Sequence, residues 1–499
     1  MAEPVERPSI KPLNKWGRLK DTLKDKLKDP KRTLGSDNWP LVAGSAVLGL
    51  VVAAGAVIAA GPWDSGQRKA ERDRAAVRDR TGGAHHGRTT PGGADPAPSA
   101  PAVLGALGST VPRSAPEGAS GLPDTLAPLL DSPALGTRST AVVIDTATGK
   151  QLYGHGATTP MTPASTVKIA TAAAALSALG PDHRIATTVR ASPDGRTLTL
   201  VGGGDPTLGK AALRALAADT VRALRAKGVT SVKLAYDTSR YSGPALHPIG
   251  PNENIAPVSA LMVDEGRLDS TDRGPAPRTT DPAGDAARAF AGYLDDDGVA
   301  TKSAPRAGRP AAASEPVATH RSAPLSSLVE RALTNSDNDI AEALARQTAL
   351  AAGEPADFKG SRRAVTAQLK KLKLPVTGAR LADGSGLDRE DRVTAGLLAA
   401  LLARAADPDH PELRPVLTGL PVAGFSGTLG NRYSATDRGT GVIRAKTGTL
   451  TGVNALAGTV LDHRGRLLAF AFLASGTPSA AEAEPALDAL ATALTGKTR

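Results

Sequence analysis

A serine and a lysine lie three residues apart in the stretch PASTVKIATAAAAL, residues 163–176, whose other side chains are nearly all small or apolar. A serine hydroxyl is a weak nucleophile until a base removes its proton. Burial lowers the pKa of a lysine amine, so a buried lysine can be that base. Residues three apart in a helix share a face, which brings Ser165 and Lys168 within contact range. The alternative is an ordinary amphipathic helix from which Lys168 extends to solvent.

Two further short motifs carry polar groups that could complete such a site. Ser336-Asp337-Asn338 precedes an apolar helical pattern, where the same residue types also serve as ordinary helix caps. Lys446-Thr447-Gly448 lies on a predicted strand, where the lysine could bind an anionic group or simply protect an exposed sheet edge. We expect the glycine to let a ligand backbone approach closely.

The combination is more informative than its parts. Ser-Asp-Asn also occurs at residues 36–38, outside the expected folded body, so that tripeptide alone indicates nothing. Ser-x-x-Lys occurs once in the chain, and Ser-Asp-Asn and Lys-Thr-Gly follow it in the order found in penicillin-binding proteins and serine β-lactamases. The motifs fall at a helix start, in a loop before a helix and on a strand. This order predicts a serine acyl-transfer enzyme.

Several longer stretches resemble one family within this group. They are VGGGDPTL (201–208), APVSALMVDEG (256–266), LADGSGLDREDRVTAGLLAALL (381–402) and GTGVIRAKTGTLTGVNALAG (439–458). The chain resembles the D-alanyl-D-alanine carboxypeptidase/endopeptidase family, the class C low-molecular-mass penicillin-binding proteins, over roughly residues 120–495. We interpret GGGDP as a structural turn and DGSGL as a loop-stabilising element.

The resemblance implies roles for the residues of the three motifs. Ser165 would be the acylated nucleophile and Lys168 its general base. Ser336 would relay a proton, and Asn338 would contact the substrate amide.

The remaining roles fall on one strand and on the nucleophile's own backbone. Lys446 and Thr447 would bind the terminal carboxylate of D-alanine or of penicillin, and Gly448 beside them would belong to the substrate-binding residues. The oxyanion hole would be the backbone N–H groups of Ser165 and Thr449. No metal or organic cofactor is implied.

The elements expected around these motifs indicate an α+β protein. Strands are predicted in residues 139–155, 441–450, 452–462 and 466–475, and helices over 165–179 and 479–495. Strands at both ends of the body suggest one antiparallel sheet with the middle of the chain inserted. The resemblance implies the transpeptidase fold of penicillin-binding proteins and β-lactamases, an antiparallel sheet flanked by helices with a helical subdomain.

The expected domain limits follow from the same reading. The catalytic domain comprises residues 121–181 and 321–499, and an accessory domain occupies 182–320. The 167 residues between Lys168 and Ser336 are few for a family with two inserted domains, so the second is expected to be reduced or missing.

The N-terminal region predicts a single membrane crossing. Residues 41–60 carry no charge and lie between Trp39 and Trp63, as in a transmembrane signal anchor. A buried core helix or a cleaved signal peptide is the alternative. Residues 1–40 form a charged arm and residues 61–120 a Pro-, Gly- and Ala-rich tether. Six Lys or Arg lie within 20–40 and six within 61–81, so charge leaves the orientation open.

Composition excludes several other classes of protein. Most of the net charge of +11 lies in residues 1–90, which hold 17 Lys and Arg and 10 Asp and Glu, and no nucleic-acid-binding motif accompanies it. The absence of cysteine excludes a thiol nucleophile and a disulfide scaffold. The eight histidines show no helical zinc-site spacing.

We therefore expect a serine D-alanyl-D-alanine carboxypeptidase that acts on peptidoglycan stem peptides, with endopeptidase activity left open, and that is acylated by β-lactams. Peptidoglycan lies outside the membrane, so residues 1–40 would be cytoplasmic and the catalytic domain extracytoplasmic. One alternative is a serine β-lactamase, which needs a deacylating base that the sequence does not identify. Another is an inactive wall-binding or assembly protein.

Overall fold

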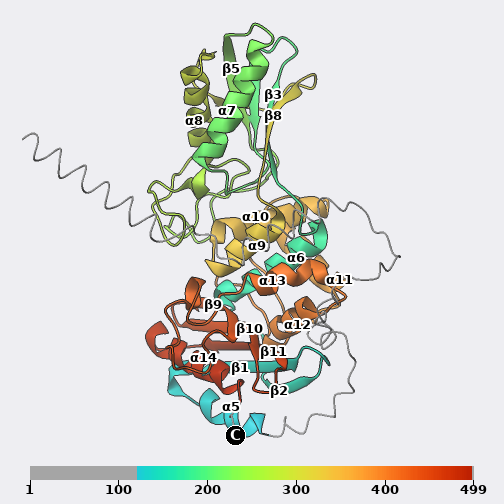
Figure 1. Ribbon diagram of the computed structural model, residues 1–499, viewed down its shortest axis with the longest axis vertical. Helices are drawn as coiled ribbons and strands as arrows, with labels where there is room; N and C mark the ends of the chain where they lie inside the picture. Colours follow the sequence, from blue (N-terminus) through green and yellow to red (C-terminus); the bar gives the residue numbers. More distant parts are fainter. Residues whose placement is uncertain (1–120, 497–499) are drawn as a thin grey trace, which may run out of the picture. The chain divides into compact units, whose positions relative to one another are not determined.

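The two ends of the folded body meet in one five-stranded antiparallel sheet. The computed structural model describes residues 121–496 (Figure 1). The sheet order is β2-β1-β11-β10-β9, formed by β1 (Arg138–Asp145), β2 (Gln151–His155), β9 (Ile443–Leu450), β10 (Val453–Leu461) and β11 (Leu467–Ser475). Strands from the start of the body therefore pair with strands from its end, as the sequence predicts.

Both faces of this sheet are covered, which explains why its central strands are apolar throughout. In β11, Ala469, Ala471 and Leu473 join the core on one face, while Phe470 and Phe472 join the core on the other. The second face is covered by α5 (Leu122–Leu130) and α14 (Ala480–Ala493), as Figure 1 shows.

A helical layer covers the first face and contains the nucleophile motif. It comprises α6 (Lys168–Leu179), α9 (Leu325–Thr334), α10 (Asn338–Ala351), α11 (Phe358–Lys371), α12 (Ala395–Ala406) and α13 (Arg414–Thr418). Every residue of α6 from Lys168 to Leu176 is buried. A helix without a solvent-facing stripe belongs in a core, and its alanines allow neighbouring helices to pack closely.

The start of the nucleophile helix differs from the prediction. We expected an α-helix from Ser165, but residues Ala164–Val167 form a 3-10 helix, and α6 begins at Lys168. Ala164 has φ of 47°, a conformation that residues other than glycine rarely adopt. A tighter first turn is common at helix N-termini, and here it sets the direction in which the serine points.

The inserted segment forms a second sheet with its own core. Its strands, in the order β6-β5-β4-β3-β8 with β7 also paired to β5, are β3 (Ala186–Ala191), β4 (Thr197–Val201), β5 (Ser231–Asp237), β6 (Ala300–Thr301), β7 (Arg306–Ala307) and β8 (Glu315–Arg321). Helices α7 (Lys210–Arg225) and α8 (Pro282–Asp296) pack on this sheet through apolar side chains.

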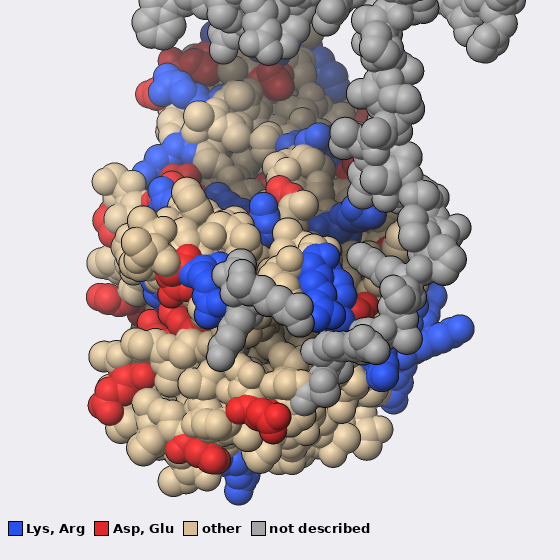
Figure 2. All heavy atoms as spheres, turned by 60° about the horizontal axis from the view of Figure 1, so that its bottom comes forward, with Lys and Arg blue, Asp and Glu red and all other residues tan. Residues whose placement is uncertain are grey.

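The predictions for the N-terminal region lie outside the described residues. These are the charged arm, the membrane segment 41–60, the tether and the second Ser-Asp-Asn triplet at residue 36. Within residues 121–496, no helix combines the length and apolar character needed to cross a membrane. On the face shown in Figure 2, the basic and acidic side chains that can be seen are interspersed. They do not form the stripe of one sign that marks a nucleic-acid-binding face.

Candidate active site

The serine and the lysine of the first motif are in direct contact. Lys168 Nζ lies 2.9 Å from Ser165 Oγ, and the lysine is 1% exposed. The turn that carries them is held by Thr166, whose hydroxyl donates to the Pro163 carbonyl at 2.7 Å. Lys168 therefore does not extend to solvent, and the alternative of an ordinary amphipathic helix is wrong.

Two further acceptors orient the lysine amine. Lys168 Nζ donates to Asn338 Oδ1 at 2.7 Å and to the Ser385 carbonyl at 2.6 Å. A neutral amine has two N–H groups and one lone pair. When those two acceptors take the N–H groups, the lone pair faces Ser165 Oγ. This is the geometry that a general base needs.

The surroundings of Lys168 keep its amine close to neutrality. Burial lowers the pKa of Lys168, while the charges of Asp383, Asp337, Glu342 and Asp391 raise it, and the balance is a pKa of about 8. An amine with this pKa is deprotonated in a useful fraction of molecules near neutral pH.

The Ser-Asp-Asn motif forms the loop between α9 and α10. Ser336 has φ of 58°, and Asp337 caps α10 by accepting from the Ile340 backbone N–H at 3.0 Å. Asn338 donates from Nδ2 to the Asn254 carbonyl of the inserted segment at 2.9 Å. Its amide is therefore shared between the base and the inserted segment, where we expected only a substrate contact.

Charged residues from both segments brace this loop. Arg278 Nη1 lies 2.9 Å from Asp339 Oδ2, and Arg331 forms ion pairs with Glu265 and Asp337. Burial, more than any neighbouring charge, raises the pKa of Glu265 to about 8. Because guanidinium groups already bind these carboxyls, we interpret the cluster as a brace and not as a metal site.

The Lys-Thr-Gly motif lies on β9. Lys446 is fully buried, and its Nζ donates to the Thr447 carbonyl at 2.9 Å. Burial, followed by the charge of Lys168, holds the pKa of Lys446 well below its usual range. Thr447 Oγ1 donates to Thr428 Oγ1 at 2.8 Å. Sequence reasoning missed Thr428, because a lone threonine in a loop gives no signal.

Gly448 has a packing role that we did not anticipate. A Cβ atom there would lie 2.6 Å from the Pro163 carbonyl and 3.2 Å from Ala164 Cβ. We expected a ligand backbone to lie close to Gly448, but in this structure residues 163–164 of the protein itself lie there. The glycine lets β9 lie directly against Ser165.

A cavity of about 300 Å³ opens beside these groups. Its wall includes five residues of the motif regions, Ser165, Ser336, Asp337, Asn338 and Thr449, together with Thr428 and Leu387. The buried Lys168 and Lys446, and Thr447, are not among the residues that line it. The inserted segment contributes Asn254, Arg267 and Arg278. A larger hollow of about 620 Å³, beside α14 and residues 431–438, contains no motif residue. The smaller cavity is therefore the candidate site.

The loop DGSGL, residues 383–387, also belongs to the site. The Ser385 hydroxyl donates to Asp383 Oδ2 at 3.1 Å, and its carbonyl accepts from Lys168. A Cβ atom at Gly386, where φ is +82°, would lie 2.1 Å from the Ala164 carbonyl. The loop is structural, as predicted, but sequence reasoning missed its contact with the base.

GGGDP is a structural element as predicted. Cβ atoms at Gly202, Gly203 and Gly204 would all lie within 2.5 Å of neighbouring atoms. Gln347 of α10 donates to the Gly203 carbonyl at 2.8 Å. These glycines join the inserted sheet to the catalytic helices.

Comparison with known proteins identifies relatives of this arrangement. Residues 122–274 and 269–495 match the D-Ala-D-Ala carboxypeptidase 3 (S13) family. A carboxypeptidase of Mycobacterium tuberculosis is 39% identical, over 80% of this chain and 89% of its own length. A D-alanyl-D-alanine carboxypeptidase of an Actinomadura species is 32% identical, over 70% of this chain and 80% of its own length.

A solved structure shows the same fold. The crystal structure of penicillin binding protein 4 from Haemophilus influenzae superposes with a TM-score of 0.60. The match has 23% sequence identity and covers 72% of this chain and 94% of that one.

Proposed function

The chain belongs to the D-Ala-D-Ala carboxypeptidase 3 (S13) family, and from this premise we propose that it is a serine D-alanyl-D-alanine carboxypeptidase acting on peptidoglycan stem peptides. The observation that supports this most directly is the amine of Lys168, whose two acceptors leave its lone pair facing Ser165. The β-lactamase alternative gains no specific support, since we identify no additional base for deacylation.

Acylation begins when Lys168 takes the proton of the Ser165 hydroxyl. Ser165 Oγ then attacks the carbonyl of the penultimate D-alanine. We assign the oxyanion hole to the backbone N–H groups of Ser165 and Thr449, two residues that line the cavity, where they would receive the negative charge on the carbonyl oxygen. Such donors contribute about a hundredfold or more to the rate.

The leaving group departs from the same cavity. Ser336 relays the proton that Lys168 has taken to the amine of the terminal D-alanine, which restores the neutral Lys168, and we assign Lys446 and Thr447 to the binding of its carboxylate. Water then attacks the ester on Ser165 and releases the shortened peptide. A β-lactam acylates the same serine, because its ring carbonyl takes the place of the peptide carbonyl. If the leaving amine belongs to a second, cross-linked peptide instead of free D-alanine, the same reaction is an endopeptidase cleavage.

We also propose that residues 41–60 anchor the protein in the cell membrane by a single crossing. An uncharged stretch of that length between two tryptophans supports this. The substrate lies outside the membrane, so residues 1–40 are placed in the cytoplasm and the catalytic domain outside it. The tether at 61–120 lets the active site reach the peptidoglycan of the cell wall.

Release of D-alanine from a diacyl-D-Ala-D-Ala peptide tests the proposed reaction. We expect the wild-type protein to release one D-alanine for each peptide hydrolysed, and Ser165→Ala to release none. Hydrolysis of a chromogenic cephalosporin is measured in parallel. Rapid cephalosporin turnover without D-alanine release would instead identify a β-lactamase. A folded wild-type protein that neither releases D-alanine nor binds a fluorescent penicillin would identify an inactive wall protein.

A further inference from the structure

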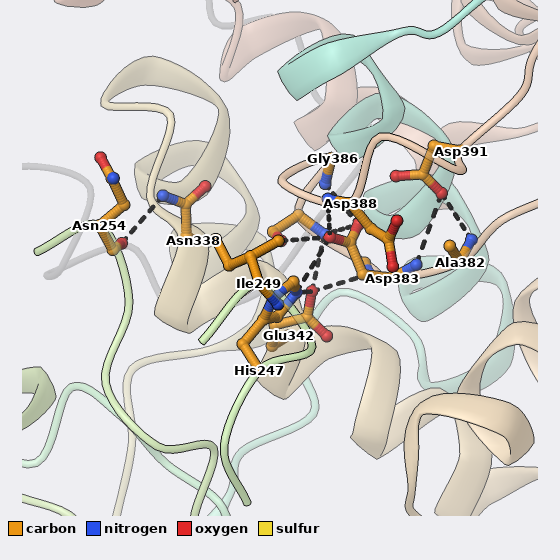
Figure 3. Close-up of polar contacts among 12 residues, drawn as sticks. His247, Ile249, Asn254, Asn338, Glu342, Ala382, Asp383, Gly386, Asp388 and Asp391 are labelled. Atoms are coloured by element: carbon orange, nitrogen blue, oxygen red, sulfur yellow. Dashed lines mark hydrogen bonds and ion pairs between the residues drawn. The ribbon is translucent and has the colours of Figure 1, made fainter. Parts of the chain in front are cut away.

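A histidine of the inserted segment is buried inside the catalytic domain. His247 is 2% exposed, and its Nε2 lies 3.0 Å from Asp383 Oδ2 and 4.0 Å from Glu342 Oε1 (Figure 3). The ring also packs edge-on against Phe358, with ring centroids 5.3 Å apart. Three separate parts of the chain, the inserted segment, α10 and the loop after residue 380, therefore meet at this imidazole.

The cluster has the composition of a metal site, but its carboxylate oxygens are already used. Glu342 Oε1 accepts from the backbone N–H groups of Gly384 and Ser385 at 2.8 and 2.9 Å. Asp383 accepts from the Ser385 N–H at 3.0 Å and from the Asp388 N–H at 2.8 Å. A carboxylate whose lone pairs receive backbone donors orders a loop. The two acids therefore fix the backbone of residues 383–388.

The same loop contacts Lys168, the proposed general base. The carbonyl of Ser385 accepts one N–H of Lys168 at 2.6 Å, and Asn338 Oδ1 accepts the other. If the Ser385 carbonyl moved, the amine could rotate, and its lone pair would no longer face Ser165. The direction of the base therefore depends on the acids that hold this carbonyl.

We propose that His247 is a positioning residue for Lys168: by binding Asp383 it fixes residues 383–388, so that the Ser385 carbonyl holds the amine with its lone pair toward Ser165. The inserted segment then controls the base as well as lining the cavity. This inference rests on the proposed function, because it assumes that Lys168 deprotonates Ser165.

The charge of His247 adds an electrostatic effect to its position. Burial disfavours the charged ring, but the hydrogen bond to Asp383 and the charge of Glu342 outweigh burial and raise the pKa of His247. Asp388 also faces the ring, and Arg346 of α10 lies over the Phe358 ring at 4.1 Å. When it is protonated, His247 offsets the charge of the buried carboxylates.

Loss of this charge and loss of a carboxylate should therefore act in opposite directions. His247→Gln leaves the negative charges uncompensated, which raises the pKa of Lys168. The part of the pH profile in which the acylation rate rises with pH, the acid limb, then moves to higher pH. Asp383→Asn removes one of the charges that raise the pKa of Lys168, so it moves the limb to lower pH. A residue that only supported the fold would lower the unfolding midpoint and leave the labelling rate of the folded protein unchanged.

The test is the rate of labelling by a fluorescent penicillin as a function of pH, with the labelled fraction at saturation. The full-length wild-type protein is compared with His247→Gln, Asp383→Asn and the control His320→Gln, which changes a histidine of β8 in the inserted sheet. We expect full labelling of all four. Below the pKa of Lys168, His247→Gln should be about tenfold slower for each unit by which the limb moves. His320→Gln should match the wild type.

The possible outcomes are distinct. Opposite shifts in His247→Gln and Asp383→Asn support the proposal. A lower labelling rate at every pH in folded His247→Gln also supports it, because the amine is then no longer held toward Ser165. A labelling rate and a pH profile in His247→Gln that both match the wild type overturn the proposal while leaving Ser165 as the nucleophile. If His247→Gln lacks a cooperative unfolding transition, His247→Asn replaces it, and a wild-type rate and pH profile there overturn the proposal. A wild-type protein that is not labelled refutes the proposed function itself.

Discussion

At the scale of single residues, the site depends on how one amine is surrounded. Lys168 is fully buried, yet it has three hydrogen-bond partners and four nearby carboxyl groups. Burial alone would push the pKa of a lysine far below neutrality, and an amine of very low pKa is a weak base. The carboxyl groups offset part of that effect. The pKa of about 8 lies close to the pH at which such a base works best.

The pH dependence of acylation follows from this value. Only the neutral amine accepts the proton of Ser165, and it predominates above the pKa. The rate of labelling by fluorescent penicillin should therefore rise about tenfold per pH unit below the pKa. It should level off above about 8. Rates measured across that range check the expectation, and a rate that falls as pH rises would contradict it.

At the scale of elements, the nucleophile turn is confined by two neighbouring glycines. A Cβ atom at Gly448 of β9 would meet Pro163 and Ala164, and one at Gly386 of the loop after residue 380 would meet Ala164 and Ser165. The unusual φ of Ala164 is kept because the chain on each side leaves no room for another conformation. The position of Ser165 is therefore set by segments far away in the sequence.

Substitution of Gly386 tests this confinement. Gly386→Ala places a Cβ atom 2.1 Å from the Ala164 carbonyl. We expect labelling at least about tenfold slower, because a nucleophile misplaced by about 1 Å can cost a hundredfold. Gly180→Ala is the matched control, since Gly180 has the same φ of +82° but no neighbour within 4 Å of its Cβ position.

The readout for this pair is the labelling rate together with the unfolding midpoint. Both substitutions carry the backbone strain of a non-glycine residue at positive φ, about 1–3 kcal/mol. Equal labelling rates in the two variants would show that the turn does not depend on Gly386.

The elements of the catalytic sheet could be predicted from sequence, whereas the parts that connect them could not. The strand around Phe470 is a continuous apolar run with turn residues before it, and this pattern is local. The contacts of Thr428 with Thr447, and of the Ser385 carbonyl with Lys168, join residues far apart in the chain. No local pattern encodes them, because each depends on how a connecting segment packs against a strand or a helix elsewhere in the fold.

At the scale of the whole molecule, the inserted segment completes the site. Asn254, Arg267 and Arg278 line the cavity together with the catalytic motifs. Asn254 also binds Asn338, one of the two acceptors of the base. The motifs at residues 165, 336 and 446 could be found without this segment. Its contribution to the site required the structure.

The proposed membrane anchor belongs to this scale as well. We expect the full chain in the membrane fraction, resistant to extraction by alkaline carbonate, because residues 41–60 match the thickness of a bilayer core. A variant that begins at residue 61 should be soluble and should bind fluorescent penicillin at the wild-type rate. Extraction of the full chain by carbonate would contradict the anchor.

The orientation of the anchor can be checked with protease added to intact spheroplasts. Degradation of the catalytic domain is expected, and its protection would place the domain in the cytoplasm.

The central claim is that Ser165 is the acylated nucleophile and Lys168 its base, and mass spectrometry of the penicillin-treated protein tests it most directly. The tryptic peptide 151–168 contains Ser165 as its single serine. We predict one adduct on this peptide, absent from Ser165→Ala. In Lys168→Ala the tryptic peptide extends to Arg184, and its adduct at Ser165 should form about 10²- to 10⁴-fold more slowly. An adduct on another peptide, or acylation of Ser165→Ala at the wild-type rate, would contradict the account.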